Sequence, residues 1–432
     1  MKHSKLFLRR LMEIDIIKVF SLNAVSTLIR MLAGIISVKV VAAIIGPAGV
    51  ALIGQLNNIT SILLGVANGC INSGITKYVA EYKEDKCEIR KLLSNALRIT
   101  LFFTFIVALF LIILHNYLSR WIMLSDEYGY VFLIFGFTIV LYTLNALLIS
   151  VLNGFREFKK YVAVNICGTF IGLIFSITLV FSFGLTGAMI NAVTFQSVLF
   201  FVTLWMCRKC QWMKYSNFSG CLDPVIIRRY LGYSLMAFTT LSLGPVSQIL
   251  LRGYVISEVS ITEAGWWEAM NRISSMYLSV ITTSFAVYYL PRLSEIKDNW
   301  ELRREIFRCY KVIVPILLIA TIVIYLLRHF IIWLLFTPEF YPMEGFFIWQ
   351  MLGDFFKIVS WLLSYLMVAK AMTKAFITTE VIFTLFFVGL GYVFIQVNGT
   401  IGLTQAYLVN YILYLLCMVI MFRRTLIPAK YK

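Results

Sequence analysis

Apolar residues form long runs along this chain, and short polar segments separate them. A helix needs about 20 apolar residues to cross a bilayer, because the hydrocarbon core is about 30 Å thick and each residue adds 1.5 Å. The pattern therefore predicts an all-α membrane protein with twelve transmembrane helices. The approximate spans are Val19–Ile45, Ala51–Ile71, Leu92–Leu114, Tyr128–Leu152, Tyr161–Phe183, Thr186–Cys207, Tyr230–Ile256, Trp266–Leu290, Val312–Leu335, Phe346–Ala369, Ala375–Ile395 and Ile401–Met421.

The composition excludes other classes of protein. Of the 432 residues, 60% are hydrophobic and only 14% are charged, whereas soluble domains are about 45–50% apolar. A soluble enzyme, a disordered chain and a secreted disulfide scaffold are incompatible with these values. Helix-breaking residues mark turns where the spans require them, at Gly46-Pro47-Ala48-Gly49 and at Asn398-Gly399.

The net charge of +17 follows from the predicted topology. If the N-terminus is cytoplasmic, most of the 38 Lys and Arg residues fall in inner segments, and the outer loops hold one, Arg120. This asymmetry is typical of multi-pass membrane proteins and predicts that both termini are cytoplasmic. Anionic membrane lipids account for any remaining attraction, so nucleic acid is not expected as a partner.

The positions of the spans predict two lobes of six helices. Residues 1–207 form the predicted N-terminal lobe, 208–229 a cytoplasmic linker between the lobes, and 230–432 the C-terminal lobe. Ala48-Gly49 and Ala264-Gly265 open corresponding spans of the two halves. With six spans each, the lobes share one orientation and are related by a pseudo-two-fold axis along the membrane normal.

Charged residues within the spans are the main candidates for function, because each costs about 2.5–3.5 kcal/mol at the bilayer centre. They recur with other polar residues at helical spacing, which places them on faces that must meet protein or water. Five cations against two carboxylates predict a hydrated, cationic cavity. The predicted substrate-binding residues are Arg30, Lys39, Asn57, Asn68, Arg252, Glu268, Arg272, Asp354 and Lys357.

Structural roles are the alternative for several of these residues. Glu268–Arg272 and Asp354–Lys357 have the spacing of helical ion pairs, and asparagines on the second span are also typical of contacts between helices. Lys39 points about 180° away from Arg30 unless the helix bends. Arg30 and Arg252 have no obvious local partner, so an anion such as a phosphate is expected there.

No metal or cofactor is expected. Cys207 and Cys210 have zinc-ligand spacing, but no second pair lies nearby and the chain has three His residues. None of the cysteines lies in an outer loop, so no disulfide is expected either. Cys221 lies with other cysteines on the predicted inner side.

Several motifs resemble the Wzx flippases of enterobacterial polysaccharide assembly, a family that includes lipid III and O-antigen flippases. The motifs are Gly46-Pro-Ala-Gly, Gly74-Ile-Thr-Lys-Tyr-Val-Ala-Glu-Tyr82, Ser284-Phe-Ala-Val-Tyr-Tyr-Leu-Pro-Arg-Leu-Ser294 and Trp349-Gln-Met-Leu-Gly-Asp-Phe-Phe-Lys357. The resemblance implies the fold of the multidrug/oligosaccharidyl-lipid/polysaccharide (MOP) exporters, which is similar to that of the MATE transporters. It also implies that Arg30, Lys39, Asp354 and Lys357 match charged positions in the family.

The resemblance further implies a cargo and a route. The family moves oligosaccharides linked to undecaprenyl pyrophosphate from the cytoplasmic to the periplasmic leaflet of the bacterial inner membrane by alternating access. A polysaccharide polymerase and a chain-length regulator are implied as partners. Because Glu268 and Arg272 add charge to the eighth span, an O-antigen unit and enterobacterial common antigen both stay open as cargo.

Two other functions remain as hypotheses. A MATE-like multidrug/cation antiporter has similar architecture but requires an acidic cavity. A membrane enzyme, either a polymerase or a glycosyltransferase, needs large outer loops or acidic motifs, and the outer loops here are short. Candidates for coupling flipping to proton or sodium movement are Asp354 and Glu268.

Overall fold

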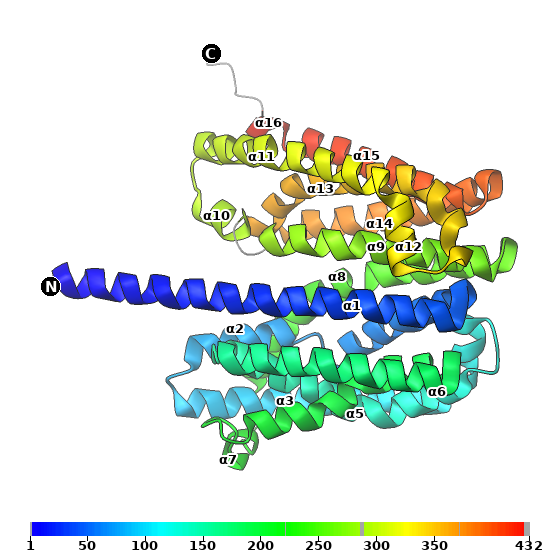
Figure 1. The fold of residues 1–432 in the computed structure, drawn as a ribbon. Coiled ribbons are helices and arrows are strands. Elements are labelled where there is room, and N and C mark those ends of the chain that lie inside the picture. The colour runs from blue at the N-terminus through cyan, green and yellow to red at the C-terminus, as the bar shows by residue number, and fades with distance from the viewer. Residues whose placement is uncertain (1, 221, 286–288, 371, 427–432) are drawn as a thin grey trace. The chain divides into compact units, whose positions relative to one another are not determined.

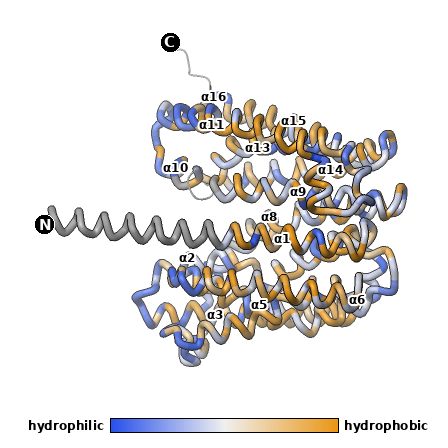
Figure 2. The backbone as a smooth tube through the Cα atoms, in the orientation of Figure 1, coloured by the Kyte–Doolittle hydropathy of each residue, from blue (hydrophilic) through white to orange (hydrophobic). Residues whose placement is uncertain are grey.

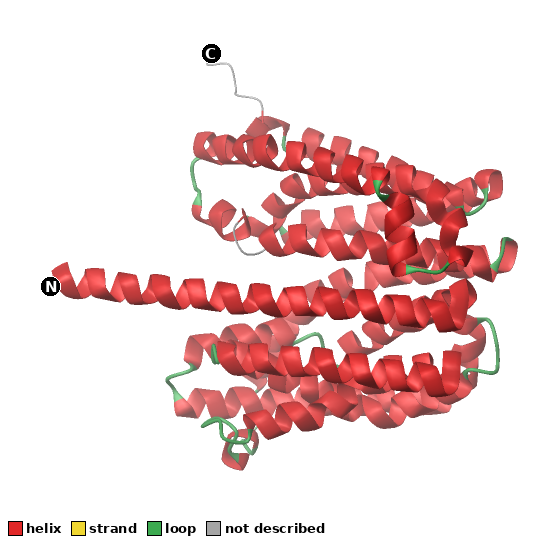
Figure 3. Ribbon diagram, viewed as in Figure 1, coloured by secondary structure: helices red, strands yellow, loops and turns green. Residues whose placement is uncertain are grey.

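The structure, a computed structural model, describes residues 2–220, 222–285, 289–370 and 372–426, and this part consists of helices joined by loops (Figure 3). Cys221 and residues 286–288 of the Ser284–Ser294 motif lie outside this part. Two long helices, α1 (Lys2–Ala67) and α6 (Phe158–Cys207), each contain one non-helical glycine. Gly46 and Gly184 have φ values of 63° and 55°, a region that glycine adopts readily. Each label therefore covers two of the predicted spans.

The chain forms two compact units, each described separately. The first unit comprises Met1–Ile44 and Ile59–Leu241, and the second comprises Ile45–Asn58 and Ser242–Lys432. Besides its parts of α1 and α8 (Pro224–Glu258), the first unit contains α2 (Asn72–Tyr82), α3 (Lys86–Ile113), α4 (His115–Leu118), the π-helix η1 (Ser119–Met123), α5 (Gly129–Gly154), α6 and α7 (Tyr215–Phe218).

Helices α3, α5 and α6 lie side by side in the first unit (Figure 1). Leu92, Leu148 and Tyr230 are buried in a core that also includes Trp212, from the segment that follows α6. The Trp212 ring stacks on Phe155 with centroids 5.7 Å apart. The aromatic side chain therefore fastens this polar segment to the helices.

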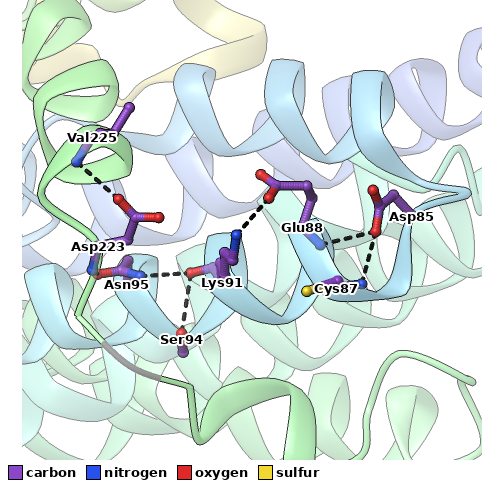
Figure 4. A network of polar contacts seen from close by, with 8 residues as sticks. All are labelled: Asp85, Cys87, Glu88, Lys91, Ser94, Asn95, Asp223 and Val225. Carbon is purple, nitrogen blue, oxygen red and sulfur yellow. Dashed lines mark hydrogen bonds and ion pairs between the residues drawn. The ribbon is translucent and has the colours of Figure 1, made fainter.

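Asp223, in the segment predicted as a linker between the lobes, lies beside α3 (Figure 4). Asp85 caps α3 by accepting hydrogen bonds from the backbone N–H groups of Cys87 and Glu88. Two turns further, Asn95 Oδ1 accepts from the backbone N–H of Asp223 at 3.1 Å. Trp212 and the Asp223 backbone thus contact other parts of the first unit, so the described residues of this segment pack within that unit.

The second unit contains α9 (Ile261–Ser284), α10 (Leu290–Glu295), α11 (Asn299–Leu326), α12 (Arg328–Leu335), the 3₁₀ helix η3 (Pro338–Phe346), α13 (Phe347–Ala369), α14 (Thr373–Asn398), α15 (Ile401–Met421) and α16 (Arg423–Leu426). Ser260 caps α9 by accepting from the backbone N–H of Glu263 at 3.1 Å, and Asp298 caps α11 in the same way. Helix α15 packs against both α13 and α14.

The helices have the length and hydropathy of membrane spans. Among the described residues, eight helices pass that test, or nine if the bent α8 is counted. Figure 2 shows hydrophobic helix bodies with hydrophilic residues at connections such as that between α2 and α3. Large apolar side chains such as Phe105, Phe137 and Leu385 are exposed, as lipid contact requires.

The observed helices correspond to the predicted spans as follows. Gly46 and Gly184 divide two of the eight helices, and α9, which carries Glu268 and Arg272, coincides with the eighth predicted span. The count of twelve fits these helices and stays a prediction. The predicted lobes 1–207 and 230–432 also stay a prediction. The observed units divide within α8, and residues 45–58 belong to the second unit.

Candidate functional site

Arg252 is buried at the centre of a polar cluster in the second unit. Its side chain on α8 has no exposed surface and forms an ion pair with Glu268 on α9. Arg252 Nη1 also donates to Gln55 Oε1 at 3.1 Å, and Nη2 donates to Gln248 Oε1 at 3.2 Å. Arg272 Nε donates to the other Glu268 oxygen at 3.0 Å. One carboxylate therefore holds two guanidinium groups.

Glycine lets the short segment Ile45–Asn58 of α1 approach this cluster. A Cβ atom at Gly54 would lie 2.6 Å from the Glu268 carboxyl carbon, and one at Gly265 would collide with the backbone of Pro47. The close approach brings the Gln55 amide onto Arg252, and the same amide donates to the Ile249 carbonyl at 3.2 Å. Small residues in contact positions are typical of tightly packed membrane helices.

No obvious local partner is predicted for Arg252, and its ion-pair partner is distant in sequence, although Gln248 one turn earlier on α8 also accepts from it. Glu268 lies 16 residues away on the next helix and Gln55 lies 197 residues away, so neither appears in the local pattern of α8. The alternative helical pair Glu268–Arg272 is present. In this arrangement Arg252 is held by the chain's own acceptors.

A second cluster surrounds Asp354 on α13. The carboxylate is 2% exposed and accepts hydrogen bonds from three hydroxyl groups. Ser274 donates at 2.7 Å, Tyr407 donates at 2.8 Å, and Tyr277 donates to the same oxygen as Ser274. Hydroxyls from α9 and α15 thus satisfy a buried carboxylate, as burial of charge requires.

Lys357 lies one turn beyond Asp354 and is surrounded by aromatic rings. Its Nζ donates to Tyr407 Oη at 3.0 Å and lies 5.0 to 5.4 Å from the ring centroids of Trp361, Tyr407 and Tyr411. Tyr407 therefore bridges the ammonium group and the Asp354 carboxylate. Cation–π contacts of this kind stabilise a partly buried ammonium group.

Arg30 lies in different surroundings, in a pocket of the first unit with a volume of about 340 Å³. Its side chain is exposed, and none of the described side chains forms an ion pair or hydrogen bond with its guanidinium. The wall opposite is formed by α6, on both sides of Gly184. The polar residues that line the pocket are Arg30, Ser37, Asn165, Thr169, Ser176, Asn191 and Gln196.

Sequence reasoning missed the polar residues of α6. Asn165, Thr169 and Ser176 are spaced by four and seven residues, which places them on one helical face. This spacing was the available signal. Asn191 and Gln196 lie beyond the Gly184 turn, so only the folded chain brings them to the same pocket.

Three other predicted residues lie apart from these clusters. Lys39 is half-buried on α1 and does not line the Arg30 pocket, and Asn57 is exposed on the segment Ile45–Asn58. Asn68 is 5% exposed at the end of α1, and its side-chain oxygen has no hydrogen-bond partner among the described residues. Their roles as cargo contacts stay predictions.

Two tryptophans and the cysteine pair also have defined positions in the structure. Trp267 is buried against Arg252, with the guanidinium 5.4 Å from its ring, and Trp266 donates to the Glu339 carbonyl at 2.9 Å. Among the described residues, no group of three or more His, Cys, Asp or Glu side chains could hold a metal ion. Cys210 lies against Lys160 and Glu157, and burial raises the pKa of its thiol.

The sequence matches a known family over most of its length. The profile of the polysaccharide biosynthesis protein family matches residues 16–297. The chain belongs to this family. It is also 29% identical over 393 residues to the lipid III flippases of Escherichia coli (strain K12) and Shigella flexneri, covering 91% of this chain and 94% of each relative.

Solved structures show the same fold. The lipid II flippase MurJ in an inward closed conformation has a TM-score of 0.71 at 17% identity, covering 94% of this chain and 87% of that one. A MATE family multidrug resistance transporter of the MOP superfamily in an inward-facing conformation has a TM-score of 0.67 at 15% identity, covering 92% and 95%. The all-α fold expected for MOP and MATE-like transporters is confirmed.

Proposed function

We propose that this protein is a flippase that moves lipid-linked oligosaccharides across a membrane. The observation that carries the proposal is the exposed Arg30 in an open pocket within membrane-spanning helices. A cation there requires an anionic partner, and a lipid-linked pyrophosphate supplies one. The near full-length similarity to lipid III flippases supports the same function, and it supports transport as opposed to enzymatic catalysis.

The cargo class follows from the chemistry of the pocket and from the relatives. Undecaprenyl pyrophosphate carries two phosphates, a sugar chain and a hydrocarbon tail that stays in the lipid. Arginine binds phosphate oxygens through paired N–H groups. The repeat unit is an O-antigen or enterobacterial common antigen unit, and it is released at the periplasmic leaflet of the bacterial inner membrane. Polymerase and chain-length regulator are the proposed protein partners.

The proposed cycle is alternating access between two six-helix lobes, with both termini in the cytoplasm. Arg30 takes the pyrophosphate first, with Lys39, Asn57 and Asn68 as further contacts along the route. Arg252 and Glu268 reach cargo only when their ion pair opens, because Arg252 has no exposed surface in this structure. Arg272 and the Lys357 cluster complete the proposed set of contacts.

Asp354 and Glu268 are the proposed sites for ion coupling. Asp354 accepts from hydroxyl groups on α9 and α15, and Glu268 pairs with Arg252 on α8 and with Arg272 on its own helix. A change in the charge of either carboxylate would therefore alter the packing between helices. Flipping measured in proteoliposomes with imposed proton and sodium gradients tests this. A flipping rate that is indifferent to both gradients removes antiport.

Complementation tests the function itself. The gene is expressed in bacterial strains that each lack one defined flippase, for O-antigen, common antigen or peptidoglycan precursor. Restored surface polysaccharide in one of the first two strains is expected. Arg30→Glu should abolish complementation at unchanged protein level, because an acidic side chain repels the pyrophosphate. Failure of the wild-type chain in both strains contradicts the proposal.

A MATE-like multidrug/cation antiporter is the second candidate, favoured by the likeness to MATE structures. It predicts binding of cationic drugs, which Arg30 opposes electrostatically. Drug efflux measured in a strain deleted for its own exporters separates the two functions.

A further inference from the structure

The pocket around Arg30 has a pattern of donors and acceptors that goes beyond what a phosphate needs. Asn165 Nδ2 donates to the Tyr161 carbonyl at 3.0 Å, and the Thr169 hydroxyl donates to the Asn165 carbonyl at 2.8 Å. The Thr169 hydroxyl has thus spent its one proton on the helix, whereas the Asn165 amide keeps a second N–H. The oxygen atoms of both side chains present acceptor positions on this wall of the pocket.

Two further asparagines have buried side-chain oxygens, namely Asn191 in the pocket lining and Asn145, which is bonded to the lining residue Gln196. Asn191 Oδ1 and Asn145 Oδ1 are buried and have no hydrogen-bond partner among the described residues. Asn145 is 1% exposed, and its Nδ2 donates to Gln196 Oε1 at 2.8 Å, which fixes the Gln196 amide at the pocket. Because its oxygen accepts from Asn145, the Gln196 amide keeps its Nε2 donors, so the pocket lining offers donors beside the Asn165 and Thr169 acceptors, as sugar hydroxyl groups require.

We infer that this pocket is a carbohydrate subsite, in which hydroxyl groups of one sugar ring of the cargo donate to α6 and an acceptor on the cargo faces Arg30. An ionised phosphate has no proton to donate, so it matches Arg30 but leaves the Asn165 and Thr169 oxygens unmatched, whereas a sugar hydroxyl group both donates and accepts. The Phe195 ring, which also lines the pocket, offers an apolar face for the C–H groups of a sugar. A volume of about 340 Å³ is at the small end of ligand pockets.

Small residues keep this pocket open. A Cβ atom at Gly172 would lie 2.7 Å from the Phe195 ring, so glycine there makes room for the aromatic side chain. At Gly34 a Cβ atom would meet nothing within 4 Å, so a larger side chain would enter the pocket without disturbing its neighbours. Gly34 therefore offers a way to fill the subsite.

The inference rests on the proposed function. Binding of two lipids, one with and one without the sugar, tests the two claims separately. Purified protein in lipid nanodiscs is titrated with undecaprenyl pyrophosphate without sugar and with the same lipid carrying an oligosaccharide repeat unit, and binding is measured by native mass spectrometry. Asn191→Leu and Gln196→Leu should each weaken binding of the sugar-bearing lipid about ten-fold. Binding of the sugar-free lipid should be unchanged.

Matched controls distinguish a filled pocket from a damaged fold. Gly34→Leu should weaken binding of the sugar-bearing lipid more than the sugar-free one. Gly389→Leu introduces the same side chain at another glycine with open space around it, on α14, and should bind both lipids normally. Thr194→Val, on α6 but outside the pocket lining, should also behave as wild type.

Each outcome decides between the two claims. If the pocket variants lose both lipids equally, the pocket binds the pyrophosphate and the carbohydrate subsite is wrong. If they bind both lipids as wild type does, the pocket does not contact cargo and the inference is also wrong. If the wild-type protein binds and flips neither lipid, the proposed function falls, and the subsite with it.

Discussion

Arg30 and Arg252 are the same residue type within membrane-spanning helices, and the two units treat them in opposite ways. Arg252 in the second unit has no exposed surface and is held by Glu268, Gln55 and Gln248. Arg30 in the first unit is exposed in an open polar pocket, and no described side chain pairs with it. A guanidinium in a membrane protein thus obtains its acceptors either from its own chain or from a ligand.

The difference separates stability from binding. Arg252 and Glu268 are interdependent, because removing one partner of a buried pair leaves an uncompensated charge. Arg30 contributes little to the packing of its unit and is available to an anion. Substitutions at the two sites should therefore have different signatures, and Arg272, at 19% side-chain exposure, should fall between them.

The largest effect is expected for Glu268→Gln. The change removes the only acidic partner of Arg252 and Arg272 among the described ion pairs and leaves two cations side by side. A loss of about 3–5 kcal/mol in unfolding free energy is expected. Thermal unfolding of the purified protein in detergent measures it. An unchanged melting temperature would mean that water or lipid reaches Arg252.

Arg30→Gln should have the opposite signature. Loss of a charge-assisted contact to cargo should reduce flipping by about ten- to a hundred-fold. The unfolding free energy should change by no more than about 0.5 kcal/mol, as for other exposed positions. Flipping in proteoliposomes and thermal unfolding are measured on the same preparation. A large stability loss with normal flipping would remove the contrast with Arg252.

Tyr407→Phe tests the bridge between Lys357 and Asp354. It removes one hydroxyl that both groups use, while the ring that faces Lys357 is kept. A loss of about 1–3 kcal/mol in unfolding free energy is expected, because a buried carboxylate loses a donor. Tyr411→Phe is the matched control, since its ring also faces Lys357 and should stay in place. Equal losses in the two variants would contradict the bridge.

Of the three variants that remove a contact within the second unit, Arg272→Gln should have the smallest effect on the unfolding free energy. Glu268 keeps its buried ion pair with Arg252, and the lost pair is a partly exposed one between neighbouring turns of α9. About 0.5–1 kcal/mol is expected from comparable pairs. A double-mutant cycle with Glu268→Gln measures the coupling. Strong coupling, comparable to that between Arg252 and Glu268, would place Arg272 with the buried pair.

The fold was largely predictable because hydropathy alone marks helices that cross a membrane. The turns at Gly46-Pro47 and the all-α class follow from local sequence, and the structure has them. The predicted charged residues are within helices, as expected. Local sequence is informative here because each span forms its hydrogen bonds within itself.

The clusters were less predictable because their partners are distant in sequence. Gln55 reaches Arg252 across 197 residues, and Asn145 reaches Gln196 across 51. Helical spacing shows which residues share a face, but it does not show which face packs against it. The exposed state of Arg30 and the burial of Arg252 were therefore indistinguishable in the sequence.

The membership of Ile45–Asn58 in the second unit has a consequence for biosynthesis. This segment is synthesised long before Arg252 and Glu268. The Gln55 side chain can therefore form its hydrogen bonds with the second unit only after that unit has been translated. A gene divided within residues 208–229 would yield a C-terminal fragment without that piece. Such fragments should regain transport only when both are produced in one cell.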